Sequence, residues 1–294
     1  MKKLAILFAL VAIAAIAIVP TTSAADPPTK NKRLLLVTHS TGFVHDSVGL
    51  AEEILKDIGP KNGFDVTCWR YTGNFEDKAG NKTIFEKYQD DFRRVTKIPV
   101  EKENCGRINK ETLKNFDVVL FFTTGNPLNK AELADLEEWV KAGGAFAGTH
   151  CATDTLYGTS YGSLVGGYFD GHPWHQKIKV NVEDPKHPAA AGFMTGDEIT
   201  DEIYQFRDNP YSREKLHIIM SVDNSSIDVN KGKRKDKDYA IAWCQEYGKG
   251  KSFYTSLGHR KEVWKDKRFQ SHLLGGLKWA TGEVKGDATP SGKK

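Results

Sequence analysis

Two things are scarce in this chain, cysteine and net charge, and each scarcity excludes a class of protein. Four cysteines among 294 residues are too few for a small scaffold built on disulfides, although one bridge between Cys68 and Cys105 could close the polar segment that they flank. The 42 lysines and arginines oppose 38 acidic residues, which leaves a net charge of only +4. The basic cluster at 231–237 contains an aspartate and no aromatic residue, so we expect a solvated loop there and no nucleic-acid partner.

Long apolar runs are also lacking, except at the N-terminus. Two lysines precede an apolar stretch at residues 4–19, and small residues follow it. A membrane-spanning helix needs about 20 apolar residues, so residues 1–25 are predicted to be a signal peptide; the alternative is an anchor that stays in place. We expect cleavage after Ala24 or Ala25, no membrane anchor afterwards, and a periplasmic or secreted protein.

A single domain is expected over residues 32–282, where short apolar runs alternate with amphipathic segments. Strands are predicted at 33–38, 64–69, 116–122, 145–148, 177–183, 216–222, 240–244 and 251–257, with helices at 48–58, 131–140 and 269–279. This alternation predicts an α/β fold with a mostly parallel sheet. The polar segment 71–107 is expected to decorate the fold, and residues 283–294 to form a flexible tail.

One predicted strand leads into an unusual turn. The glycine-flanked apolar run 143–147 is followed by Gly148, Thr149, His150 and Cys151. Many α/β enzymes present a reactive side chain at such a strand-to-helix turn. Here that side chain is a histidine, which suggests proton transfer or metal binding more readily than acyl transfer.

Other histidines also follow predicted strands. His39 and His45 follow the first strand, and His259 follows a late one. Ligands of open parallel sheets bind at the carboxyl ends of the strands, so these side chains are expected to meet at one edge of the sheet. The residues that we expect to hold a divalent metal, zinc being the most plausible, are His45, His150, His172 and His175. Roles in loop contacts or packing are expected for His39, His187, His217 and His272.

Carboxylates and aromatic rings near these histidines complete the candidate site. Asp154 follows the turn, and together with His150 and His259 it is expected to take part in catalysis. Substrate contacts are expected from Tyr157, Tyr168, Trp174, Asp201 and Glu202. The rings would suit stacking on a sugar, and core packing is the alternative for each. The residues leave two chemistries open: a metal that activates water, or metal-free acid–base catalysis by histidine.

Four motifs occur in order along the chain. They are Gly-Thr-His-Cys-Ala-Thr-Asp-Thr at 148–155, Gly-Gly-Tyr-Phe-Asp-Gly-His-Pro-Trp-His at 166–175, Asp-Glu-Ile-Tyr-Gln-Phe at 201–206 and Phe-Tyr-Thr-Ser-Leu-Gly-His-Arg at 253–260. Together they resemble the ThuA-like (trehalose utilisation) family, over nearly all of residues 33–281. The resemblance implies a flavodoxin-like three-layer sandwich related to the class I glutamine amidotransferases.

The resemblance also bears on the chemistry. In the amidotransferases a cysteine occupies the strand-to-helix turn, and a histidine and an acid follow a late strand. In this sequence His150 stands at the turn, Cys151 comes one position late, and His259 with Glu262 resembles the late histidine and acid, so Glu262 joins the catalytic candidates. Glutamine amidotransferase activity is therefore not expected.

The family resemblance implies a sugar context, linked to oxidised disaccharides such as 3-keto sugars. We expect an exported enzyme of hydrolase or isomerase type that acts on a small sugar, with oligomer formation left open. The alternative is a non-catalytic carbohydrate-binding protein that uses the same cleft. A third hypothesis, an amidase or peptidase with Cys151 as nucleophile, ranks last.

Overall fold

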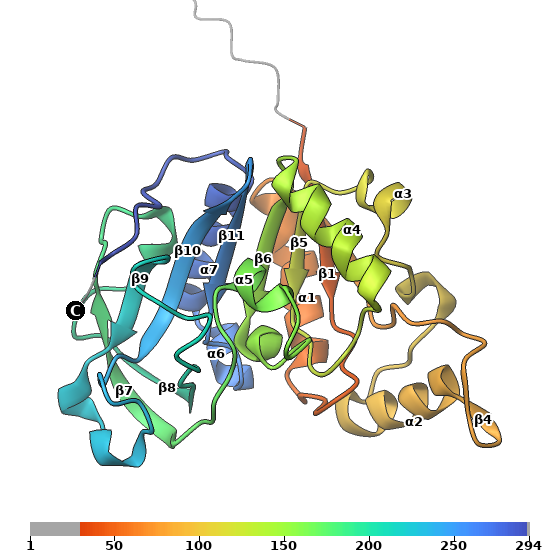
Figure 1. Cartoon of the computed structure of the whole chain (residues 1–294), viewed down its shortest axis with the longest axis horizontal. Helices are drawn as coiled ribbons and strands as arrows, with labels where there is room; N and C mark the ends of the chain where they lie inside the picture. The colour runs from red at the N-terminus through yellow and green to blue at the C-terminus, as the bar shows by residue number, and fades with distance from the viewer. Residues whose placement is uncertain (1–29, 293–294) are drawn as a thin grey trace, which may run out of the picture. The chain divides into compact units, whose positions relative to one another are not determined.

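A nine-stranded sheet runs through the computed structural model, which describes residues 30–292 (Figure 1). Its parallel part consists, in spatial order, of β2 (Phe64–Trp69), β1 (Lys32–Val37), β5 (Val118–Phe121), β6 (Ala145–Thr149) and β11 (Gly250–Thr255). The order continues through antiparallel neighbours β10 (Ala240–Tyr247), β9 (His217–Val222), β7 (Trp174–Val182) and β8 (Glu198–Ile203). Chain order reverses beside β1, which is where open α/β sheets bind ligands.

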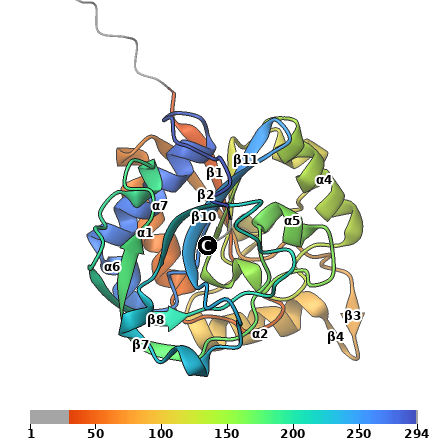
Figure 2. The same cartoon turned by 60° about the vertical axis from the view of Figure 1, so that its left-hand side comes forward.

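Helices cover both faces of the sheet. Successive residues of a strand point to opposite faces, so Leu34 and Leu36 belong to one buried core and Leu35 and Val37 to the other. The first core packs under α1 (Val48–Lys61) and α7 (Lys267–Ala280), and the second under α4 (Lys130–Lys141) and α5 (Tyr161–Val165). Figure 2 shows the sheet between these two groups of helices. The predicted α/β sandwich with a mostly parallel central sheet is confirmed.

Helix α1 continues past its expected end and includes Pro60 in its last turn. Gly59 brings this turn close to β2, since a Cβ at that position would lie 2.5 Å from Cγ2 of Val66. Only one helical residue follows Pro60, so the proline interrupts little of the helix. Packing of the last turn against β2 therefore outweighs the tendency of Gly59 and Pro60 to end the helix.

The polar segment 71–107 is more regular than the sequence suggested. It contains a short hairpin, β3 (Lys78–Ala79) with β4 (Lys82–Thr83), and helix α2 (Ile84–Thr96), which lie beside the sheet (Figure 1). Thr83 and Glu86 form a reciprocal capping box at the start of α2. Only Tyr88 and Phe92 of this helix are buried, so its apolar face is narrow and its sequence is mostly polar. The short helix α3 (Lys110–Leu113) follows.

Residues 283–292, expected to be flexible, are attached to the sheet. The backbone N–H of Ser291 donates to the carbonyl of Leu216, and the Oγ of Ser291 accepts from the N–H of Ile218. Strand β7 pairs with β9 only near Met220 and Val222, so this part of the chain covers an edge that β7 leaves open.

Two other sequence predictions concern disulfides and the membrane. All four cysteines are free in the structure, and the Sγ of Cys105 donates to the carbonyl of Glu101 instead of pairing with Cys68. Among residues 30–292 there is no helix with the length and apolar character needed to cross a bilayer. The predicted signal peptide, residues 1–25, lies outside the described residues.

Candidate functional site

Four segments that are distant in the sequence bring ligand-type atoms together at the carboxyl edge of the parallel strands. His45 lies in the loop after β1, His150 directly follows β6, and His259 lies between β11 and the short helix α6 (Lys261–Lys265). Glu202 comes from β8. One nitrogen or oxygen of each residue lies within 4.8 Å of those of the other three. We call His45, His150, Glu202 and His259 the inner group.

The turn after β6 fixes the orientation of His150. Its φ is +46°, in the left-handed region that non-glycine residues rarely adopt, and the chain continues as a 3₁₀ turn, His150–Thr153. The Nδ1 of His150 lies 2.9 Å from the carbonyl oxygen of Ser256. A carbonyl can only accept, so Nδ1 carries the proton and Nε2 faces the inner group. The hydroxyl of Tyr204 lies 3.0 Å from this Nε2.

Glu202 is the centre of the histidine arrangement. Its Oε2 lies 3.3 Å from Nε2 of His150 and 3.3 Å from Nδ1 of His259. Its Oε1 lies 3.4 Å from Nδ1 of His172 and 3.4 Å from Nε2 of His175. Burial alone would raise the pKa of Glu202, but the hydrogen bonds with His150 and His259 outweigh burial and hold the pKa below its usual range. The carboxylate is therefore ionised, and each of its oxygens faces two imidazoles.

His45 and His259 respond differently to the same surroundings. Burial, together with the neighbouring imidazoles of His150 and His259, lowers the pKa of His45 to about 2, so this ring is neutral at ordinary pH. The Nδ1 of His45 is buried and has no hydrogen-bond partner within the described part of the chain. For His259, burial would lower the pKa, but the contact with Glu202 prevails and raises it.

The inner group fits a divalent metal ion. Zinc bonds of about 2.0–2.1 Å to imidazole imply that neighbouring ligand atoms of a tetrahedral site lie roughly 3.3 Å apart. The separations among His150, Glu202 and His259 are 3.2, 3.3 and 3.3 Å. The Nε2 of His150 and the ionised Oε2 of Glu202 lie 3.3 Å apart, and a cation between the two atoms could be bound by both. His45 is the fourth member of the group, with a ring nitrogen within 4.8 Å of the ligand atoms of the other three residues.

The outer part of the site is open to solvent. The side chains of His172 and His175 are 51% and 46% exposed. We call these two residues the outer pair. A cavity of about 220 Å³ adjoins His259 and is lined by Asp46, His175, His259, Arg260, Lys261 and Glu262. Glu262 therefore lines this cavity. The carboxylate of the inner group is Glu202 of β8.

Asp154 and Tyr157 lie together behind the turn. Burial raises the pKa of Asp154, and a hydrogen bond with Tyr157 opposes this. The hydroxyl of Tyr157 also donates to the carbonyl of Phe169, and the guanidinium of Arg207 lies 4.4 Å from the centre of its ring. The predicted roles of Asp154 in catalysis and of Tyr157 in substrate binding stay predictions.

Three expected substrate contacts are buried, where the structure gives them protein partners. The Nε1 of Trp174 donates to the carbonyl of Asp228, and the hydroxyl of Tyr168 accepts from the N–H of Gly162. Asp201 accepts from the backbone N–H groups of Gly258 and Arg260, on either side of His259. The structure therefore does not bring these side chains into the cavity.

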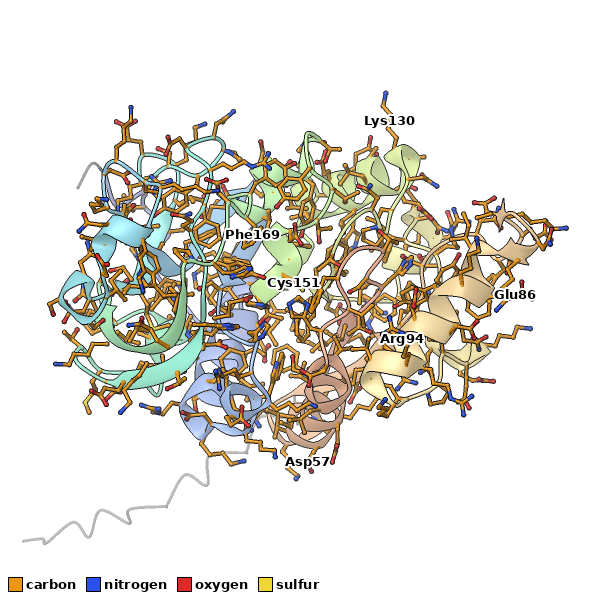
Figure 3. All side chains as sticks on the ribbon, turned by 90° about the horizontal axis from the view of Figure 1, so that it is seen from below. Asp57, Glu86, Arg94, Lys130, Cys151 and Phe169 are labelled. Carbon is orange, nitrogen blue, oxygen red and sulfur yellow. The ribbon has the colours of Figure 1, made fainter. Side chains whose placement is uncertain are left out.

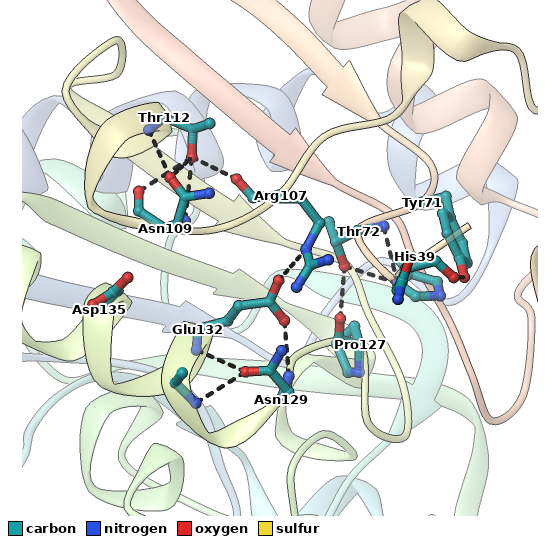
Figure 4. Close-up of polar contacts among 12 residues, drawn as sticks. His39, Tyr71, Thr72, Arg107, Asn109, Thr112, Pro127, Asn129, Glu132 and Asp135 are labelled. Carbon is teal, nitrogen blue, oxygen red and sulfur yellow. Dashed lines mark hydrogen bonds and ion pairs between the residues drawn. The ribbon is translucent and has the colours of Figure 1, made fainter. Parts of the chain in front are cut away.

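The remaining histidines lie outside the inner group. His39 accepts from the N–H of Thr72 beside Pro127, as Figure 4 shows. Its pKa is lowered by burial to about 3. His217 lies 3.0 Å from Asp184, on another part of the sheet. His187 and His272 are buried.

Cys151 is placed where it cannot act as a nucleophile on a dissolved substrate. Its side chain is fully buried among other side chains near the middle of Figure 3. Burial raises the pKa of the thiol well above its ordinary value, so it stays protonated. At this turn His150 therefore belongs to the inner group, while Cys151 is buried in the core.

Sequence reasoning missed two groups that contact His150. Tyr204 stands two residues after Glu202 in a motif that was noted, but nothing in its pattern predicted that its hydroxyl reaches His150. The carbonyl of Ser256 is a backbone atom, and its role follows only from the end of β11 lying beside β6.

The fold and the site define an α/β sandwich with a histidine-rich, metal-capable centre at the carboxyl edge of its sheet. The sequence matches the trehalose utilisation family, ThuA, over residues 33–280, and the chain belongs to this family. The family name suggests a sugar-related role and a sugar-related small-molecule ligand.

Among the solved structures with a similar fold are two of proteins described as putative ThuA-like proteins. The one from Bacteroides uniformis is 18% identical, with a TM-score of 0.60 and coverage of 88% of this chain and 94% of that chain. The one from Parabacteroides merdae is 18% identical, with a TM-score of 0.58 and coverage of 89% and 96%. No curated protein matches the chain. At this identity the two structures support the fold alone.

Proposed function

We propose that this protein is a metal-dependent enzyme that acts on a small sugar by hydrolysis or isomerisation. The observation that carries the proposal is the inner group, in which three imidazoles and one carboxylate converge from four segments. Imidazole and carboxylate ligands suit zinc and other first-row divalent cations, and the spacings among His150, Glu202 and His259 match those of a tetrahedral zinc site. The family name supports a sugar as the substrate class.

A divalent cation held by the inner group would polarise a sugar carbonyl or lower the pKa of a water molecule. The protein's own residues prepare the site for this. The Ser256 carbonyl fixes the tautomer of His150, and Asp201 holds the backbone on both sides of His259. The Tyr204 hydroxyl lies 3.0 Å from Nε2 of His150, at the edge of the inner group.

The neighbouring cavity suits a hydroxyl-rich ligand. Its volume is about 220 Å³, and every side chain that lines it carries a charge or an imidazole. Lys261 and Asp46 form an ion pair at 2.8 Å across the cavity rim. Such a lining offers both donors and acceptors to sugar hydroxyls and little apolar surface.

We also propose that the protein is exported. Two lysines followed by the apolar run at 4–19 and by small residues support cleavage after Ala24 or Ala25. N-terminal sequencing of the protein recovered from the cell envelope or the medium tests this proposal. An intact N-terminus on protein in the cytoplasm would contradict it.

Metal analysis combined with an activity screen tests the enzymatic proposal. Purified protein should retain at least one equivalent of a divalent metal, and His45→Ala and His150→Ala should lose it. On 3-keto glycosides and oxidised disaccharides, the loaded protein should give a product that the variants do not form. His217→Asn, outside the inner group, is the matched histidine control.

The same screen decides between an enzyme and a carbohydrate-binding protein. Saturable sugar binding without a product from any tested sugar would favour the carbohydrate-binding protein and refute the enzymatic proposal. The burial of Tyr168 and Trp174 favours the enzyme, because neither ring is available for stacking on a sugar.

A further inference from the structure

Glu202 has more imidazole neighbours than a single cation needs. The inner group uses Oε2, while Oε1 faces the outer pair at 3.4 Å from Nδ1 of His172 and 3.4 Å from Nε2 of His175. These two separations are close to the roughly 3.3 Å expected between neighbouring ligands of one tetrahedral cation. The two carboxylate oxygens therefore face two different sets of ligand atoms.

The inner group already offers four protein ligand atoms, three imidazole nitrogens and one carboxylate oxygen. A catalytic cation keeps a position open for water or substrate. The outer pair is half exposed, and His175 lines the cavity beside His259. The Oε1 side of Glu202 therefore offers a ligand position that is open to solvent.

The outer pair is positioned by its neighbours. His172 stacks on Phe169, with ring centres 5.7 Å apart and an angle of 21° between the planes. The preceding Gly171 has φ +110°, a conformation that places the turn beside Gln205 and that a side chain would strain. The ring centre of His175, at the start of β7, lies 4.9 Å from that of His259.

We propose that His172, His175 and Oε1 of Glu202 bind a second divalent cation, so that Glu202 bridges two cations. This proposal rests on the proposed function, because it requires a first cation in the inner group. The second cation would hold the substrate oxygen at the cavity, and the first would fix the bridging carboxylate. Two-metal sites of this type stabilise both the attacking and the leaving oxygen of a displacement.

The experiment counts cations. Full-length mature protein is stripped with a chelator, dialysed against Zn²⁺, and analysed for zinc per chain. The native chain should bind two equivalents, and the double variant His172→Gln with His175→Gln should bind one. Circular dichroism checks that the double variant folds. We expect it to fold, because both substituted side chains are half exposed. The His217→Asn variant should still bind two equivalents.

A spectroscopic measurement adds a readout that does not depend on activity. With Mn²⁺ in place of zinc, two cations bridged by one carboxylate should give an exchange-coupled electron paramagnetic resonance spectrum. The double variant should give the spectrum of an isolated ion. An isolated-ion spectrum from the fully loaded native chain would overturn the bridge.

The outcomes separate this inference from the proposed function. One equivalent in both the native chain and the double variant would overturn the second site and leave the first intact. Two equivalents in the double variant would overturn the assignment to His172 and His175. No bound metal in the native chain would overturn both the proposed function and this inference.

Discussion

Replacing Asp201 by alanine should loosen the segment that carries His259 and destabilise the whole domain. The carboxylate of Asp201 is fully buried and accepts two backbone hydrogen bonds, from Gly258 at 2.8 Å and from Arg260 at 3.0 Å. A hydrogen bond to a charged group contributes about 1.5–3 kcal/mol, so losing both should lower the free energy of unfolding by roughly 3–6 kcal/mol. Domains are stable by only about 5–15 kcal/mol, so this is a large fraction.

Urea denaturation of the native chain, Asp201→Ala and Asp201→Asn measures this loss. Asparagine keeps the shape and one acceptor, so about half of the effect is expected. Glu198→Gln, at an exposed position on the same strand, is the control; it removes only the surface ion pair with Lys177 and should change the free energy of unfolding by at most about 1 kcal/mol. Because Asp201 fixes both neighbours of His259, Asp201→Ala should also bind zinc more weakly. A loss below about 1 kcal/mol with unchanged zinc affinity would refute the positioning role.

Three further predictions concern buried groups. Burial lowers the pKa of His272 from 6.5 to about 4. Between these two pH values the unfolded chain therefore binds more protons than the folded chain. The free energy of unfolding should fall by up to about 3 kcal/mol as the pH drops from 6.5 to 4. In urea titrations, His272→Gln should flatten this slope, and an unchanged slope would contradict the assignment. Iodoacetamide should label partly exposed Cys105 first and Cys151 only after unfolding, and mass spectrometry follows the labelling. Rapid labelling of Cys151 in the native protein would support the amidase hypothesis instead. Tyr168→Phe removes the acceptor for the N–H groups of Thr159 and Gly162, so chemical denaturation should show a loss of about 1–3 kcal/mol, while calorimetric sugar binding stays unchanged.

The parallel half of the fold could be predicted because its strands are buried on both faces. Runs such as Val118–Phe121 are continuously apolar and are followed by turns, which fixes both their type and their ends. Three residues of the inner group stand in the loops after such strands, so the polarity of the sheet was enough to place them at one edge. The topology therefore predicted the meeting of His45, His150 and His259, and their side-chain orientations came only with the structure.

Strand β8 shows where the sequence was insufficient. Its sequence, Glu198–Ile203, contains acidic residues at positions 201 and 202, and such residues are uncommon in strands. Both carboxylates are buried here because each has specific partners: backbone N–H groups for Asp201 and imidazoles for Glu202. These partners lie in distant segments, so nothing in the local sequence indicated that four histidines surround Glu202. The sequence therefore led us to expect only that Glu202 binds substrate.

The turn after β6 presents a histidine to the inner group, and its backbone conformation shows why an imidazole suits this position. The positive φ of His150 is a strained conformation, which costs of order 1 kcal/mol and must be offset by contacts. An imidazole supplies those contacts because it has two nitrogens: Nδ1 is fixed by Ser256 while Nε2 remains directed at Glu202. A thiol at the same position has one reactive atom and could not be both anchored and directed. Cys151, one residue later, points into the core, so the chemistry of this turn depends on which of two adjacent residues takes the strained position.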